Sequence, residues 1–326
     1  MTKKTRYFMA GSAAILAAGL ATGLIAYYGG GFQALSASTG PTELAYVPAD
    51  AAVIAYADVG AIMSSELRQR IKEAMPVHQD GQEEFQRETG IDIERDIQYV
   101  VASITPGTHS ALLVARGNFN PTLLESLAVE HGGTVETYRD MRLVSTTKNL
   151  NGHGQTGTLA FLEPGLVAIG DTATVKRAID AKVSGTSVTS NDEIMTLVKQ
   201  IEQSQNAWAL GRFDALTSQA KLPDQITKQL PPVRWFTTGV HINGGVSGMV
   251  RVEATDDEAA ELLRRQVNGA LAFGEMMSRS DVRAAAVLNS IQMSGTGKTV
   301  QLSFTVPGEL LQMVLPARTD MAVEPQ

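Results

Sequence analysis

The sequence contains no cysteine, and this absence excludes several kinds of site at once. Disulfide bonds, thiolate metal centres, iron–sulfur clusters and covalently attached c-type haem all require cysteine. The chain has 326 residues, 44% of them hydrophobic, and is therefore long enough to bury a core without cross-links. This length predicts one large globular domain or two ordinary ones.

Recognisable catalytic motifs are also missing. The chain has no G-x-S-x-G turn, which positions the nucleophile in many hydrolases, and no HExxH zinc motif. None of the five histidines lies three or four residues from another; they are His78, His109, His131, His153 and His241. We interpret them as structural or surface residues, and expect His153 in an exposed loop spanning residues 149–157. The sequence thus offers no catalytic, cofactor-binding or metal-binding residue, and we expect a protein that is not an enzyme.

Three polar clusters resemble ligand sites, and each has a simpler interpretation. Residues 295–299 (GTGKT) match the end of a phosphate-binding P-loop motif. However, Gln292 stands where the motif has its first glycine, and the segment that follows is strand-like rather than helical. We therefore predict a hairpin turn. The acids at 256–261 suit the positive end of a helix dipole, with Thr255 or Asp256 as its cap. The acids at 92–96 lack the glycine and terminal glutamate of a calcium loop, so we predict a solvated edge or a helix start.

Charge is acidic overall and unevenly distributed. The chain has 27 basic and 34 acidic residues, for a net charge of -7. The first 28 residues carry only Lys3, Lys4 and Arg6, so the remainder holds 24 basic residues against 34 acidic ones. Because phosphate backbones repel such a domain, we expect no nucleic-acid partner.

A run without charged residues extends from Phe8 to Tyr28. In a helix it would span about 30 Å, the thickness of the hydrocarbon layer of a bilayer. The basic segment 1–7 is expected to stay cytoplasmic, and Tyr27 and Tyr28 suit the opposite interface. We therefore predict a signal-anchor helix over residues 8–28. The chain would be a single-pass protein of the inner (cytoplasmic) membrane whose C-terminal domain is periplasmic or otherwise extracytoplasmic.

A cleavable signal peptide is the alternative to this anchor. Four small residues could be read by a signal peptidase, namely Ala34, Ser36, Ala37 and Ser38. However, a cleavable apolar region usually has about 7–15 residues, and the run here is longer. The length of the run therefore favours an anchor that is retained.

Gly19 and Gly23 form a small-xxx-small pair within the predicted span. Small residues allow helices to approach closely in lipid. Besides the lipid bilayer itself, we therefore expect a membrane-protein partner or a homodimer.

The rest of the chain divides into a linker at 29–43, a first half at 44–185, a second half at 186–316 and a flexible tail at 317–326. AVIAYADVGAIM at 52–63 and AWALGRFDALTS at 207–218 hold the same place in similar strand–helix orders, which suggests an internal duplication. Tight turns join most strands, so we predict an α+β fold with antiparallel or mixed sheets and helices packed on one face.

Two features of the second half favour a packed core. Trp208 and Trp235 are expected to be core aromatic residues rather than a platform for ligand stacking. The longest predicted helix, at 256–278, has an apolar face that consists of Ala259, Leu263, Val267, Ala270, Gly274 and Met277.

The opening Tyr46-Val47-Pro48-Ala49-Asp50, which follows the anchor and linker, resembles that of uncharacterised bacterial exported proteins with a single membrane anchor. The resemblance implies a location outside the cytoplasm and supplies no catalytic residues. We therefore expect a non-enzymatic, membrane-tethered binding or scaffold protein, an accessory subunit of a larger membrane complex. The alternatives are an exported soluble ligand carrier after signal cleavage and, less favoured, an enzyme with an unrecognised Asp, Glu, Ser or His site.

Overall fold

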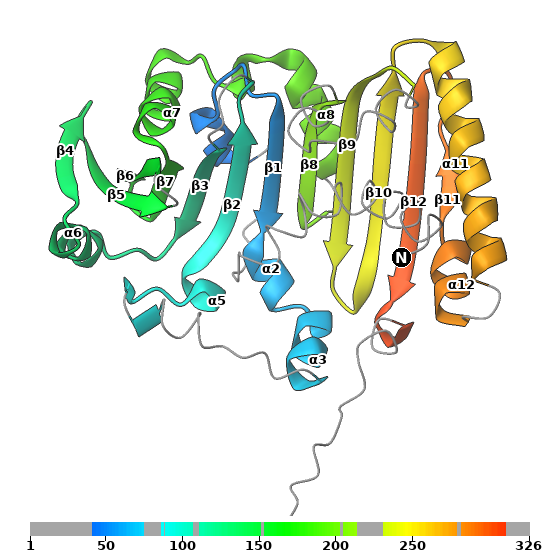
Figure 1. Cartoon of the computed structure of the whole chain (residues 1–326), viewed down its shortest axis with the longest axis horizontal. Coiled ribbons are helices and arrows are strands. Elements are labelled where there is room, and N and C mark those ends of the chain that lie inside the picture. The colour runs from blue at the N-terminus through cyan, green and yellow to red at the C-terminus, as the bar shows by residue number, and fades with distance from the viewer. Residues whose placement is uncertain are drawn as a thin grey trace, which may run out of the picture.

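A single large antiparallel sheet organises the domain in a computed structural model of the chain (Figure 1). The structure describes residues 41–74, 86–87, 89–106, 111–150, 153–202, 205–213, 231–278 and 282–310. Twelve strands lie in the order β11-β12-β10-β9-β8-β1-β2-β3-β7-β6-β5-β4, and every described pair is antiparallel. The predicted α+β class is confirmed, with an antiparallel rather than a mixed sheet.

Strands and helices alternate along the chain much as the turn residues predict. The strands are β1 Val53–Asp58, β2 Ile97–Ile104, β3 Ala111–Gly117, β4 Thr134–Tyr138, β5 Met141–Leu150, β6 His153–Glu163, β7 Leu166–Gly170, β8 Ala207–Arg212, β9 Val233–Ile242, β10 Gly245–Ala254, β11 Gln292–Ser294 and β12 Thr299–Pro307. The helices are η1 Thr42–Tyr46, α2 Val59–Met63, α3 Glu66–Ala74, α5 Ile93–Asp96, α6 Pro121–Glu130, α7 Thr172–Ser184, η2 Val188–Ser190, α8 Asp192–Glu202, α11 Asp257–Met277 and α12 Val282–Asn289.

The two halves of the chain meet at the pair β1–β8, where Tyr56 lies opposite Trp208. Moving outward from this seam, the first half runs β1-β2-β3-β7-β6-β5-β4 and the second runs β8-β9-β10-β12-β11, so the first half has two more strands than the second. In each half, a hairpin (β2–β3 or β9–β10) lies beside the seam strand. The last strand of that half in the sequence (β7 or β12) lies beside the hairpin. This symmetry is what a duplicated unit would produce, and the duplication itself stays a prediction.

One face of the sheet packs against η1, α7 and α8. Ile54 and Trp208 from the seam strands are completely buried there, together with Ile179 of α7 and Val198 of α8. Trp235 of β9 belongs to the same cluster and is 7% exposed. The prediction that both tryptophans are core residues is therefore confirmed.

The opposite face carries the second helical layer. Val300 of β12 packs against Ala259 and Ala260 of α11. The strand registers place Val300 on the same face as Val53, which is the opposite face from Ile54. The prediction of helices on one face only is therefore wrong. An apolar stripe on a helix indicates that the helix packs against the sheet. It does not indicate which of the two faces of the sheet the helix covers.

The orientation of α11 also differs from the prediction. Leu263 and Gly274 of the expected apolar face do pack inward, with Leu288 beside Gly274. Met277, however, is 58% exposed and Ala270 is exposed as well. Apolar residues occur almost all round the C-terminal half of this helix, so their spacing does not fix one buried face.

The predicted cap at the start of α11 is confirmed, and two other helices begin in the same way. In each, an Asn or Asp side chain accepts a hydrogen bond from the amide three residues later, and the cap residues are Asn120, Asp171 and Asp256. The amide of Ala259 is the main reason that the pKa of Asp256 lies below its usual value. The acids at the start of α11 thus have the structural role that the dipole argument predicts.

The expected loop at 149–157 is wrong. Strand β5 extends to Leu150 and β6 begins at His153, and these two residues lie opposite each other in the register. Two long strands that pair regularly can carry Gly and Asn near a hairpin end, because each residue still contributes backbone hydrogen bonds. Composition alone therefore overestimates the length of this turn.

Several predictions fall outside the described residues. These are the span at 8–28, most of the linker and the tail at 317–326, together with His78 and His109. Among the helices that the structure does describe, none is both long enough and apolar enough to cross a membrane.

Asn206, directly before seam strand β8, forms hydrogen bonds with the last residue of β9. Removing its side chain should lower the stability of the domain. Its side-chain amide donates to the Ile242 carbonyl at 2.7 Å and its Oδ1 accepts from the Ile242 amide at 2.9 Å. Because Asn206 is 7% exposed, Asn206→Ala leaves the part-buried N–H and C=O of Ile242 without this partner and should lower the free energy of unfolding by about 1–3 kcal/mol. Unfolding followed by tryptophan fluorescence measures this change, and Asn268→Ala on the exposed side of α11 should leave the stability within about 0.5 kcal/mol.

Candidate functional site

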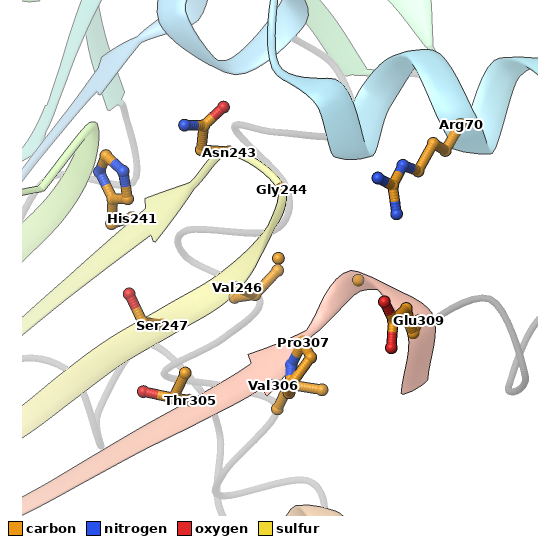
Figure 2. Close-up of a pocket in the computed structure, with 12 residues that line it drawn as sticks. Arg70, His241, Asn243, Gly244, Val246, Ser247, Thr305, Val306, Pro307 and Glu309 are labelled. Carbon is orange, nitrogen blue, oxygen red and sulfur yellow. The ribbon is translucent and has the colours of Figure 1, made fainter.

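A groove of about 510 Å³ lies between α3 and the ends of β9, β10 and β12 (Figure 2). Its polar lining side chains come from segments far apart in sequence, namely Arg70, His241, Asn243, Ser247, Thr305 and Glu309. The volume lies within the range of small-ligand sites, about 300–1,000 Å³. His241, Thr305 and Glu309 are exposed, so the groove opens to solvent.

The groove has a rigid frame because the first half of the chain docks there on the second. The Leu67 amide near the start of α3 donates to the Asn243 carbonyl in the β9–β10 turn at 2.7 Å. Gly244 in the same turn faces Gly308 after β12, and a Cβ on Gly308 would lie 2.1 Å from the Gly244 carbonyl oxygen. A side chain at residue 308 would therefore force these two segments apart.

The charges in the groove are largely balanced. Arg70 forms an ion pair with Glu66 one helical turn earlier, and Figure 2 shows its guanidinium near Glu309 on the opposite wall. The remaining polar groups are an imidazole, an amide and two hydroxyls, which supply hydrogen bonds but no pre-formed charge. Within the described residues, no three His, Asp or Glu side chains gather as a metal site would require. This groove can bind a polar group. Ser247 lies opposite His241 in the register of β10 and β9, and no hydrogen bond joins these two described side chains.

A second polar cluster surrounds Arg116 of β3. Its guanidinium forms an ion pair with Glu43 of η1, whose side chain is 4% exposed, and lies 3.9 Å from Glu163 at the end of β6. The Tyr46 hydroxyl donates to Glu163 at 2.9 Å, and the Lys182 ammonium lies 5.2 Å from the centre of the Tyr46 ring. This cluster, defined by Glu43, Tyr46, Arg116 and Glu163, is called the entry clamp because it holds the first described element to the sheet.

The electrostatics of the entry clamp favour a structural role. Burial, followed by the hydrogen bond to Glu163, raises the pKa of Tyr46 above its usual range. The phenol is thereby kept protonated, which is the opposite of what a tyrosine base or nucleophile needs. Arg116 is likewise engaged by the buried carboxylate of Glu43. The clamp fixes the chain at the point where the predicted linker enters the domain.

The polar clusters at 295–299 and 92–96 have the structural roles that the sequence predicts. Residues 295–298 form the turn between β11 and β12, and the amide of Thr299, the first residue of β12, donates to the Thr296 carbonyl. The hairpin prediction is confirmed. Asp92 caps α5 through the Glu94 amide, and the helix-start prediction holds there too. The predicted topology residues Lys3, Lys4 and Arg6 and the packing residues Gly19 and Gly23 lie outside the described residues.

Sequence reasoning missed both the groove and the entry clamp. Glu43 and Arg116 are 73 residues apart, and no short motif connects them. Only the strand order brings η1, β3 and the β6–β7 turn together. The Tyr46-Val47-Pro48-Ala49-Asp50 segment lies in this region, but its sequence does not indicate its charged neighbours.

Half-buried Asp58 caps α2 at the end of β1 and should make stability depend on pH. Its Oδ1 accepts from the Ala61 amide at 2.8 Å, and burial raises the pKa of its carboxyl. A raised pKa means that the folded state binds the proton more tightly, so this residue's contribution to stability falls as pH rises from the unfolded value through the folded one. Asp58→Asn keeps the cap without the charge.

The Asp58→Asn variant is therefore expected to unfold at a higher temperature than the parent at pH 7. The difference should shrink as the pH is lowered through the carboxylate range. Thermal unfolding of both proteins at pH 7 and pH 4 measures it, and a difference that widens on acidification would contradict the assigned sign.

Comparisons with known proteins place this chain in no family. No protein-family model matches it, and no curated protein sequence does either. Among solved structures, crystal form I of TP0453 aligns with a TM-score of 0.46 at 12% identity, covering 86% of this chain and 98% of that one. Crystal form IV of TP0453 gives a TM-score of 0.45, also at 12% identity, over 85% and 96% of the two chains. Similarity at this level carries no inference about function.

Proposed function

We propose that the chain is a non-enzymatic, membrane-tethered binding or scaffold protein, an accessory subunit of a larger membrane complex. Residues 8–28 would form a single span of the inner membrane and hold the twelve-stranded domain outside the cytoplasm. The observation that carries this proposal is the uncharged run from Phe8 to Tyr28, preceded by Lys3, Lys4 and Arg6. Its length and flanking charge are typical of a signal anchor.

The entry clamp is consistent with a tether. The first described helix, η1, begins at Thr42, so the predicted linker at 29–43 is wrong for its last two residues, which belong to the folded domain. Glu43 attaches this helix to β3, and Tyr46 attaches it to the end of β6. A linker that enters at such a fixed point would restrict the domain to the membrane surface and raise its effective concentration towards neighbours there.

The groove favours a binding or scaffold role over the alternative of a soluble ligand carrier. A carrier needs an enclosed, mostly apolar cavity that buries its ligand. The groove in Figure 2 is instead open, with exposed His241, Thr305 and Glu309 along it. Such a surface suits a polar segment of another protein, which would lie across the hairpin ends without being enclosed.

Purification of the full chain in mild detergent tests this role. We expect a stoichiometric membrane-protein partner that is lost from the Thr305→Arg and His241→Glu variants, because both substitutions alter exposed groove side chains. Val183→Arg serves as the matched control, since Val183 is 57% exposed on α7 and does not line the groove. All three variants should keep the parent unfolding temperature. A chain that purifies alone from membranes, or a partner that the groove variants retain, would contradict the proposal.

A further inference from the structure

Helix α11 exposes an apolar stripe that the fold does not use. Four of the nine large hydrophobic side chains exposed among the described residues lie on this helix: Leu262 (39%), Phe273 (53%), Met276 (52%) and Met277 (58%). Together with Gly269, they share one side of the helix: Leu262 lies two turns before Gly269, and Phe273, Met276 and Met277 follow at spacings of three or four residues. The α11 stripe is defined here as these five residues. Figure 1 shows α11 running alongside the β12–β11 end of the sheet.

The stripe is separate from the side of α11 that packs on the protein. Ala260 is completely buried and Leu263 packs in the same cluster against Val300. Further along, Gly274 lies against Leu288 of α12. The inner side of α11 thus packs on the protein near both ends of the helix. The exposed stripe is a second apolar side of the same helix, separate from that packed side. α11 carries more exposed large hydrophobic side chains than any other described element, whereas hydrophobic residues exposed singly are common on protein surfaces and need no explanation.

We infer that the α11 stripe binds the α11 stripe of a second copy of this chain, with the two helices antiparallel and Gly269 at the two-fold axis. A two-fold contact requires a patch that is complementary to itself. In this arrangement residues equally distant from Gly269 meet, so Leu262 faces Met276 of the second copy. Arg265, exposed beside the stripe, faces the Phe273 ring of the second copy, which is a favourable cation–π pair.

Two further features suit the antiparallel arrangement. A Cβ on Gly269 would meet no atom within 4 Å, so the helices can approach closely at the axis. Antiparallel packing also places opposite ends of the two helix dipoles together. Gly269 lies near the middle of this 21-residue helix, so an axis at Gly269 lets the two helices overlap over most of their length.

A single pair of helices buries less surface than the roughly 1,200–2,000 Å² of a stable complex. The contact should therefore be weak in dilute solution and populated where the chains are concentrated. In this respect the inference rests on the proposed function, because confinement to a membrane supplies the concentration. The contact itself depends only on the α11 stripe.

Cysteine cross-linking tests the contact directly, because the chain has no cysteine of its own. The Gly269→Cys variant of the full chain, reconstituted in lipid vesicles, should form a disulfide-linked dimer on mild oxidation, since paired Cα atoms at a helix crossing can reach the required ~5–6 Å. Asn268→Cys, exposed on the same helix but about 100° away, is the matched control and should cross-link at least tenfold more slowly. Adding Phe273→Glu to Gly269→Cys should reduce cross-linking to the control rate.

The outcomes separate the contact from the tether. Each sample is also tested for flotation with the vesicles, and the cross-linking is repeated with concentrated chain in detergent. Preferential cross-linking of Gly269→Cys in both conditions supports the contact. The same preference in detergent from a chain that does not float with vesicles retains the contact and overturns the tether. Equal rates for Gly269→Cys and Asn268→Cys, or no effect of Phe273→Glu, overturn the contact whatever the flotation shows.

Discussion

Replacing Arg116 by methionine is expected to lower the free energy of unfolding of the domain by about 3–5 kcal/mol. The substitution leaves the Glu43 carboxylate, whose side chain is 4% exposed, without its positive partner. A buried charge that loses its partner costs far more than a surface pair does. Chemical unfolding followed by the fluorescence of buried Trp208 and Trp235 measures the loss.

Two further variants show whether the loss comes from the unpaired carboxylate. Glu43→Gln combined with Arg116→Met removes both charges and should recover most of the stability. Arg177→Met breaks the exposed ion pair with Asp50, whose side chains are 42% and 61% exposed, and should cost less than about 1 kcal/mol. If Arg116→Met costs no more than Arg177→Met, the entry clamp does not hold the first turn as described.

Placing two arginines in the apolar run should release the chain from the membrane. Each arginine near the centre of a spanning helix costs about 2.5–3.5 kcal/mol on insertion scales, so Leu16→Arg with Leu20→Arg opposes insertion by about 5–7 kcal/mol. We expect the parent chain to remain in the membrane pellet after an alkaline wash and the double variant to appear in the soluble fraction. Fractionation followed by detection of the intact chain measures the shift.

A conservative pair controls for changes in length or packing. Leu16→Ile with Leu20→Ile keeps the apolar character and should fractionate like the parent. If the double arginine variant stays in the washed membranes, the proposed span is not what holds the chain there.

Local features of the fold were the ones that sequence could predict. Asn120, Asp171 and Asp256 each cap a helix because a short polar side chain beside a helical pattern can satisfy a free amide. The glycines at 244–245 and around residue 297 bend hairpins whose strands show clear β character. These signals need no knowledge of distant residues.

The features that sequence could not predict depend on the order of strands in space. Whether α11 covers the same face as α8 is decided by register across several strands, and local periodicity contains no such information. The outward orientation of Phe273 and Met277 has the same origin. The partners of Arg116 are likewise brought together only by the completed sheet. The groove and the α11 stripe therefore emerge from tertiary structure, whereas the proposed tether rests on the uncharged run from Phe8 to Tyr28 in the sequence.

The most direct test of the tethered arrangement is the sidedness of two single cysteines in the full chain. Thr5→Cys lies in the basic segment before the apolar run, and Val183→Cys lies at a position that is 57% exposed on the folded domain. In sealed right-side-out membrane vesicles, a membrane-impermeant maleimide should label Val183→Cys at once and Thr5→Cys only after the vesicles are opened. Labelling of both cysteines before opening, or of Thr5→Cys alone, would contradict the tethered, outward-facing domain.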